Sequence, residues 1–284
     1  MTTESERYQN RLWHLLVANG IVASDSDLPG AITAFQEKEG GLLADGVAGP
    51  QTLWVLQQVL LEVQLPLTRL DVRPPPAVET ERTINLRADV ALAYRKLQKD
   101  LEDLGGSMTS AGGVRRLSSG ANANRSSLSH HYWGGAFDLA MPSGFFNPRR
   151  DPFVIERTSP RTWRVWARAE GAEKRTVTAT YWDNWTAGRD KTMEVTDNLA
   201  DFTDLAAVHG FKPIGPRSTF TRDRNRLYGG AEWWHFQYEQ GLFPGISQIG
   251  IEILRMSHVS ETAYKRANKG LWDSRRTVFH QGWR

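Results

Sequence analysis

Three consecutive prolines, Pro74 to Pro76, interrupt the chain after its first quarter and constrain its fold more than any other feature. Proline fixes φ and removes a backbone donor, so such a run forms a stiff, extended connector. A chain of 284 residues suits one medium-sized domain and one small domain. We therefore predict a small domain over residues 1–68, a proline-rich linker over 69–84 and a second domain over 85–284.

The first domain contains three segments whose apolar residues recur at helical spacing, which predicts a small three-helix domain. The segments span residues 5–21, 29–40 and 49–63. Ser5 is a suitable N-cap for the first helix, and Pro50 lies at a favoured first-turn position of the third.

The second and third of these segments form the run AITAFQEKEGGLLADGVAGPQTLWVL, residues 31–56. This run resembles the peptidoglycan-binding domain, a three-helix module with a Phe-Gln pair, an Asp-Gly turn and a Gly-Pro-x-Thr sequence. Here these are Phe35-Gln36, Asp45-Gly46 and Gly49-Pro50-Gln51-Thr52. The resemblance implies that the domain binds peptidoglycan; the alternative is a helical unit without a ligand.

The second domain mixes helical and strand patterns, so we expect an α+β fold with a small antiparallel sheet flanked by helices. Residues 86–106 predict a long amphipathic helix that ends at two glycines. Residues 161–182 predict a β-hairpin, 196–210 a helix capped by Thr196 or Asp197, and 231–239 a buried strand.

The composition excludes several kinds of chemistry and of partner. Cysteine is absent, which excludes thiol nucleophiles and thiolate metal ligands. The net charge of +3 favours anionic surfaces, but no basic run is long enough to indicate nucleic acid. No apolar stretch reaches the length of a membrane span, so no membrane insertion is expected. The sequence indicates no oligomeric state.

The N-terminus lacks a basic segment followed by an apolar one, so we expect no secretory signal peptide. A protein of this kind would be made in the cytoplasm and would act on a cell wall after release or through a dedicated export route.

The residue types that suit metal binding and catalysis lie in two short segments, residues 129–138 and 232–235. They follow the patterns S-x-H-x-x-G-x-A-x-D and E-x-W-H, which resemble the zinc D-alanyl-D-alanine metallopeptidases, relatives of lysostaphin-type enzymes and hedgehog domains. Every position of both patterns is filled, by Ser129, His131, Gly134, Ala136 and Asp138, and by Glu232, Trp234 and His235.

The residue types also suit this chemistry by themselves. A catalytic zinc has three protein ligands and one open position, and His131, Asp138 and His235 offer two imidazoles and a carboxylate for one Zn²⁺ per chain. Glu232 is then the candidate general base. Residues three apart point to opposite faces of a straight strand, so we expect a bulge or a strand start between Glu232 and His235.

Amide hydrolysis also needs a positively charged group that stabilises the negative oxygen of the tetrahedral intermediate. The resemblance implies an arginine in a G-x-R sequence before the first of these segments. Arg115 matches that position, and Arg116 is the alternative candidate. Either arginine also suits the carboxylate of a D-alanine-ended peptide. Ser129 and Trp234 are expected to contact the substrate.

Two histidines are adjacent, and only one keeps the spacing of the pattern. His131 lies seven residues before Asp138, whereas His130 breaks the alignment to the glycine and alanine. We therefore assign His131 as the ligand and His130 to the wall of the site or to a supporting position.

About 94 residues separate Asp138 from Glu232, which is longer than the compact members of the family need, and we predict an insertion at about 142–195. Its tryptophans Trp163, Trp166, Trp182 and Trp185 are expected either to wall the cleft, to bind glycan or to be an inert decoration.

Together these features predict a zinc metallopeptidase that cleaves an amide in the stem peptide or cross-link of peptidoglycan, as an endolysin does. One alternative is a D-alanyl-D-alanine carboxypeptidase or dipeptidase, and another is a muramoyl amidase. An alternative of a different class is a cell-wall-binding protein without catalytic turnover.

Overall fold

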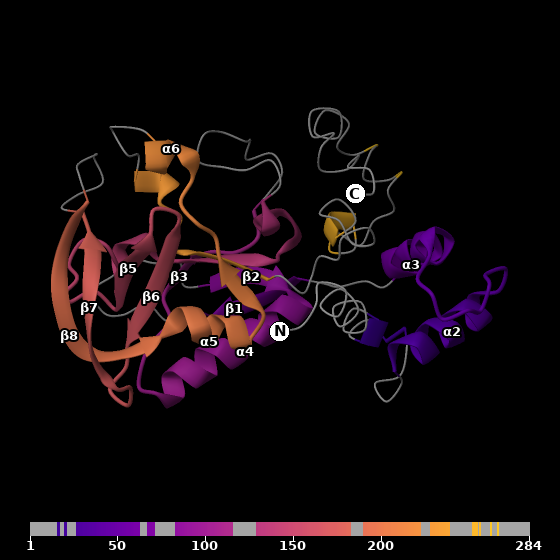
Figure 1. Cartoon of the computed structure of the whole chain (residues 1–284), viewed down its shortest axis with the longest axis horizontal. Coiled ribbons are helices and arrows are strands. Elements are labelled where there is room, and N and C mark those ends of the chain that lie inside the picture. Colours follow the sequence, from indigo (N-terminus) through magenta and orange to yellow (C-terminus); the bar gives the residue numbers. More distant parts are fainter. Residues whose placement is uncertain are drawn as a thin grey trace. The chain divides into compact units, whose positions relative to one another are not determined.

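The computed structural model describes residues 16–17, 20–21, 27–62, 67–71, 83–115, 129–182, 190–222 and 228–238, with 252–254, 256, 262 and 266. The chain divides into two compact units, Met1–Pro66 with Gln240–Arg284, and Leu67–Glu239. Figure 1 shows the elements of both. None of the helices in the described part of the chain combines the length and the apolar character needed to cross a bilayer.

The first unit contains two described helices, α2 (Leu28–Glu39) and α3 (Pro50–Glu62). Asp27 caps α2 by accepting a hydrogen bond from the Gly30 N–H at 2.8 Å. Both helices match the predicted segments. Of the first predicted segment only Leu16, Val17, Gly20 and Ile21 belong to the described residues, so the three-helix arrangement stays a prediction.

The motif residues of this unit hold the connection between α2 and α3 together. Gln36 is 1% exposed, and its Nε2 lies 3.0 Å from Asp45 Oδ1 and 3.1 Å from both Val47 O and Thr52 Oγ1. Its Oε1 accepts from the Gly46 N–H at 3.0 Å. A buried amide with all these partners fixes the loop, because losing one of them would leave a polar group unpaired.

The second unit has the predicted α+β composition. Its helical elements are α4 (Ala88–Asp103), η2 (His130–Trp133), η3 (Met141–Ser143), α5 (Phe202–Val208), α6 (Ser218–Arg222) and η4 (Tyr228–Gly230). Its strands are β1 (Leu67–Asp71), β2 (Thr83–Arg87), β3 (Ser110–Gly112), β4 (Ala136–Leu139), β5 (Phe153–Ser159), β6 (Thr162–Arg168), β7 (Lys174–Tyr181), β8 (Lys191–Asp201), β9 (Phe211–Pro213) and β10 (His235–Tyr238).

These strands form three antiparallel groups. β1 pairs with β2, so residues at both ends of the predicted 69–84 linker are strand residues of this unit. A four-stranded sheet has the order β3-β4-β10-β9, and a closed barrel has the order β5-β6-β8-β7. Figure 1 shows the barrel strands gathered beside α4 and α5.

The barrel corrects the prediction for residues 161–182. β6 and β7 follow each other in sequence, but β6 pairs with β5 and β8, and β7 pairs with β8 and β5. They are therefore not a hairpin. Buried apolar side chains from all four strands pack into one cluster, which contains Val154, Trp166, Val177, Ala179, Val195 and Leu199.

The boundary between β8 and α5 also differs from the prediction. The helix expected from residue 196 begins at Phe202, because residues 196–201 continue β8 in register with β7 and β6. Asp201 is the N-cap and accepts from the Asp204 N–H at 3.0 Å. Strand pairing with distant residues outweighs the local helical pattern here.

An aromatic cluster joins the barrel to the polypeptide before β10. Phe145 packs against Trp163, Trp182, Tyr228 and Trp233, with ring centroids 4.6–5.5 Å apart. Trp163, Trp182 and Trp233 are each at most 2% exposed. Of the four tryptophans predicted for the insertion, Trp163, Trp166 and Trp182 are therefore buried core residues and not a surface for glycan, and Trp185 lies outside the described residues.

Candidate metal and catalytic site

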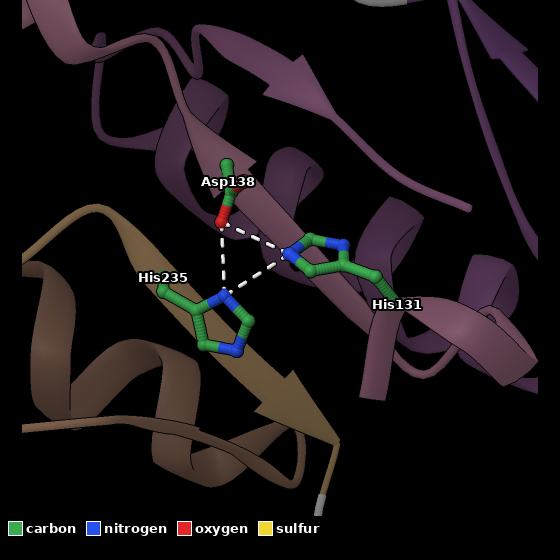
Figure 2. Close-up of side chains that lie close together, drawn as sticks. All are labelled: His131, Asp138 and His235. Atoms are coloured by element: carbon green, nitrogen blue, oxygen red, sulfur yellow. Dashed lines mark hydrogen bonds and ion pairs between the residues drawn. The ribbon is translucent and has the colours of Figure 1, made fainter. Parts of the chain in front are cut away.

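Three predicted ligands from distant parts of the sequence meet at one point in the second unit (Figure 2). His131 Nε2 lies 3.2 Å from Asp138 Oδ1 and 3.1 Å from His235 Nδ1, and His235 Nδ1 lies 2.9 Å from Asp138 Oδ1. His131 is 1% exposed and His235 6%. The structure thus brings together the three residues that the two sequence patterns and their residue types indicated as metal ligands.

Strand register explains how Asp138 and His235 meet. Asp138 on β4 is directly opposite His235 on β10, so the two side chains share one face of the sheet. On the other side of β4, Gly112 of β3 is also opposite Asp138. A Cβ on Gly112 would approach Asp138 Oδ2 to 3.1 Å, so glycine leaves space for the carboxylate.

Two glycines return the chain from His131 to Asp138. His131 lies in the 3₁₀ helix η2, which ends at Gly134 with φ 75° in the left-handed region. A Cβ at Gly134 would come within 2.7 Å of the Arg87 backbone nitrogen, and one at Gly135 within 2.0 Å of the Trp133 ring. The Gly-Gly pair therefore makes the tight turn that a seven-residue ligand spacing requires.

The hydrogen bonds of His131 define which ring nitrogen is available. His131 Nδ1 lies 2.7 Å from the Gly113 carbonyl oxygen, which can only accept, so Nδ1 carries the proton. In the neutral ring Nε2 then presents its lone pair to Asp138 and His235. A backbone carbonyl that orients a histidine in this way is typical of metal ligands.

The donor atoms fit a metal ion. In a tetrahedral site with bonds of about 2.0–2.1 Å, ligand atoms lie about 3.3 Å from one another. The three atoms here are 2.9–3.2 Å apart and form a nearly equilateral triangle. One cation between them would satisfy all three lone pairs, so the residues present could hold a divalent metal.

The Asp138 carboxyl is also held in its charged form. Burial by itself would raise the pKa of the Asp138 carboxyl, but the charges and hydrogen bonds of His131 and His235 lower that pKa well below its usual range. Asp138 Oδ2 also faces Arg115 Nη2 at 3.4 Å. The carboxylate is therefore ionised at neutral pH and available as a ligand.

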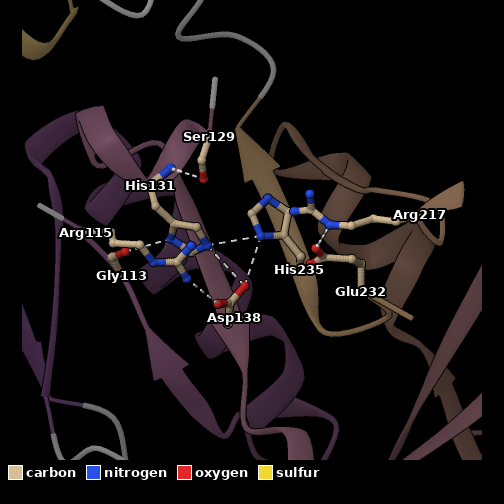
Figure 3. A network of polar contacts seen from close by, with 8 residues as sticks. All are labelled: Gly113, Arg115, Ser129, His131, Asp138, Arg217, Glu232 and His235. Carbon is tan, nitrogen blue, oxygen red and sulfur yellow. Dashed lines mark hydrogen bonds and ion pairs between the residues drawn. The ribbon is translucent and has the colours of Figure 1, made fainter. Parts of the chain in front are cut away.

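Glu232 reaches the site from an unusual backbone conformation. Its φ is 57°, in the left-handed region that non-glycine residues seldom adopt. The strand β10 begins only at His235, which is the strand start that the spacing predicted. The Glu232 side chain is 7% exposed and its Oε1 accepts a hydrogen bond from Arg217 Nε (Figure 3).

Arg217 is a site residue that the sequence reasoning missed. It directly precedes α6, and Figure 3 shows it with Glu232 on the side of His235 away from His131. No motif spacing marks it, because its pairing with a glutamate 15 residues later arises from the tertiary fold. Its guanidinium compensates the buried Glu232 carboxylate.

The remaining predicted residues divide into those at the site and those elsewhere. Arg115 is at the site through its ion pair with Asp138, whereas Arg116 lies outside the described residues. Ser129 caps η2 by accepting from the His131 N–H at 3.4 Å. Trp234 is 5% exposed and stacks on Tyr228 with centroids 5.5 Å apart.

Of the two positions predicted for His130, the described cavity lining does not include it, and η2 turns its ring toward Trp133, 5.4 Å away between centroids. Its Nδ1 is buried without a hydrogen-bond partner. Burial first, and then the charges of His235 and His131, lower the pKa of His130 to about 3. A neutral ring there supports the shape of η2.

A cavity of about 200 Å³ opens over the three candidate metal ligands. It is lined by Arg115, Ser129, His131, Asp138, Met141, Arg217, Gly229, Glu232, Trp234 and His235. Ligand candidates, a buried carboxylate and two guanidinium groups therefore face one small volume, which is the arrangement that metal-assisted hydrolysis of an amide needs.

No family model matches this chain, and no curated protein and no solved structure matches it either.

Proposed function

We propose that the chain is a zinc-dependent hydrolase that cleaves an amide bond in the peptide part of peptidoglycan. One observation carries the proposal: the carboxylate of Glu232 and the His131, Asp138 and His235 donor group line a single cavity. Two imidazoles and one carboxylate are a donor set that suits zinc, with a position left for substrate. When bound, the metal supplies Lewis acidity at the scissile carbonyl.

Glu232 has the position of a general base and acid. Its carboxylate takes a proton from the attacking water and returns that proton to the leaving amine. Arg217 holds the carboxylate oxygen in place, and Arg115 faces the cavity beside Asp138, where it would favour negative charge that develops on the substrate.

The first unit supports peptidoglycan as the substrate. The residues that resemble the peptidoglycan-binding domain form one connected structure, with Phe35 in the core and Gln36 bonded to Asp45, Gly46 and Thr52. A wall-binding module on the same chain would raise the local concentration of substrate at the catalytic unit.

Carboxypeptidase activity is a second candidate, and the size and charge of the cavity favour it. A volume of about 200 Å³ suits a short peptide end, and the guanidinium groups of Arg115 and Arg217 could hold a terminal carboxylate. The two candidates differ in product: an endopeptidase separates cross-linked muropeptides, whereas a carboxypeptidase releases free D-alanine.

Digestion of purified sacculi tests the proposal. The zinc-loaded protein is incubated with sacculi, with and without chelator, and the products are identified by mass spectrometry. We expect new peptide ends that depend on zinc and disappear in Glu232→Gln. Zinc-independent binding without any new end would instead identify a non-catalytic wall-binding protein.

A further inference from the structure

We infer that the closed barrel of β5–β8 positions the general base, through a hydrogen bond from Trp163 on β6 to the backbone next to Glu232. The inference rests on the proposed function and assigns a role to the inserted segment. None of the described barrel residues lines the cavity, so the barrel acts on the site through its support and not through substrate contact.

The backbone of Glu232 needs external support. A glutamate in the left-handed region is disfavoured by contact between its Cβ and the backbone, and such conformations persist only where surrounding contacts hold them. Without that support, the peptide before or after Glu232 would relax to the ordinary region. The carboxylate would then leave its place in the cavity that it shares with the candidate metal ligands.

The carbonyl groups of Glu232 and of the two residues before it all accept hydrogen bonds. Ala231 O accepts from Trp163 Nε1 at 2.7 Å, and this bond is buried. Gly230 O accepts from the Arg217 N–H at 2.8 Å, and Glu232 O accepts from the His235 N–H at 3.1 Å. Among these donors, only Trp163 belongs to the barrel.

Trp163 is itself held rigidly. It is 2% exposed and opposite Arg157 in the register of β5 and β6. The Arg157 guanidinium lies 5.4 Å from the centre of its ring and is anchored to Asp190 at 3.0 Å. A donor on a closed barrel moves little, because each strand is hydrogen-bonded on both sides.

The tryptophans beside the barrel also pack against the segment that follows Arg217. Phe220 of α6 is fully buried and packs on Trp163 and Trp182, with centroids 5.8 and 5.4 Å apart. Both the backbone of Glu232 and the segment carrying its guanidinium partner therefore rest on the barrel. This explains why an insertion outside the cavity carries so many buried tryptophans.

The test compares Trp163→Phe with a matched control, Trp166→Phe. Trp166 is on the same strand, is 6% exposed and also donates its indole N–H, but to Glu156 Oε2 at 2.9 Å within the barrel. Both substitutions keep an aromatic ring and remove one hydrogen bond from an indole N–H, which is buried for Trp163 and partly buried for Trp166. Only the first removes a bond to the backbone beside Glu232.

We expect Trp163→Phe to lower kcat on soluble muropeptides from muramidase-digested sacculi by at least about tenfold, with KM within about twofold and zinc content unchanged. Trp166→Phe should keep the wild-type kcat. Hydrogen–deuterium exchange over residues 228–238 should rise in Trp163→Phe alone. An unchanged kcat, or equal losses in both variants, would overturn the positioning role.

A second variant removes the donor with almost no change of shape. Benzothienylalanine at position 163 replaces the indole N–H by sulfur and keeps the bicyclic ring, so it separates the hydrogen bond from packing if the phenylalanine variant folds poorly. Wild-type kcat in this variant would overturn the inference. If the wild type itself cleaves nothing, the proposed function fails. Hydrogen–deuterium exchange tests the inference separately, because unchanged exchange over residues 228–238 in Trp163→Phe would overturn it.

Discussion

Glu232 and His235 close a tight turn immediately before β10: the His235 N–H donates to the Glu232 carbonyl at 3.1 Å, and Glu232 has φ 57°. Side chains three residues apart would point to opposite faces of a straight strand. The turn brings both into one cavity, so the candidate base and a candidate metal ligand line the same small volume.

Metal binding should depend on all three candidate ligands, His131, Asp138 and His235. We expect one equivalent of zinc per chain in the wild type and almost none in His235→Ala, because two ligands bind zinc far more weakly than three. Free zinc at a thousandfold excess over Kd should stabilise the wild type by about 4 kcal/mol. Elemental analysis and calorimetry measure both effects. The control is His209→Asn, which removes the His209 contact to Asp100 at 2.7 Å; equal zinc content in the two variants would refute the site.

Glu232→Gln should abolish most of the hydrolysis and leave the metal in place. The amide keeps the shape of the side chain but cannot take up the proton, so kcat/KM should fall by about 10²- to 10⁴-fold. Exposed Glu194 on β8 offers the control, Glu194→Gln, which should behave as wild type. Activity near wild type in Glu232→Gln would remove this residue from the base role.

Arg217 should contribute to both catalysis and stability. Arg217→Lys keeps the charge but loses the planar Nε–H that contacts Glu232, so we expect at least about a tenfold fall in kcat. Arg217→Met leaves a buried carboxylate without its partner and should destabilise the fold by up to about 3 kcal/mol. Urea unfolding and steady-state kinetics test these values. The surface pair variant Arg175→Lys should change neither, and a similar effect there would show that the loss is not specific.

In the first unit, Gln36→Leu should be the most damaging polar substitution. It removes one buried amide that serves Asp45, Gly46, Val47 and Thr52, at a cost of about 2–3 kcal/mol. Hydrogen exchange of amides in α2 and α3 of the full chain measures the local stability. Gln51→Ala, at an exposed position of α3, should change it by less than about 0.5 kcal/mol. Similar protection in both variants would mean that the network contributes little.

The second unit should lose stability at alkaline pH. Burial raises the pKa of Tyr238 to about 12, and burial also raises the pKa values of Tyr94 and Tyr228 above their usual range. An unfolded tyrosine ionises at about pH 10. The folded state therefore keeps protons that the unfolded state releases, and the stability present below pH 10 falls as the pH rises toward 12.

Absorbance at 295 nm and urea unfolding at pH 8, 10 and 11 follow this loss. Tyr238→Phe should flatten part of the pH dependence, because its ring cannot ionise. Tyrosines of the folded protein that all titrate near pH 10 would contradict the prediction.

Local sequence patterns were sufficient for several parts of this protein. The spacing of apolar residues located α2, α3 and α4, since helical periodicity is a property of one short segment. The resemblance of the two short sequence patterns, together with their residue types, indicated the three residues that meet at the candidate metal site. The resemblance that this pattern shows to zinc peptidases, and the wall-binding role, stay predictions.

Other features were decided only by the tertiary structure. The sequence of β6 and β7 resembles a hairpin, yet their partners are β8 and β5, and residues 196–201 are strand although their pattern is helical. The bonds from Arg217 to Glu232 and from Trp163 to Ala231 join segments 15 and 68 residues apart. Local sequence determines which residues suit a helix, a turn or a ligand, but strand partners and buried polar bonds depend on which distant groups the folded chain brings within about 3 Å.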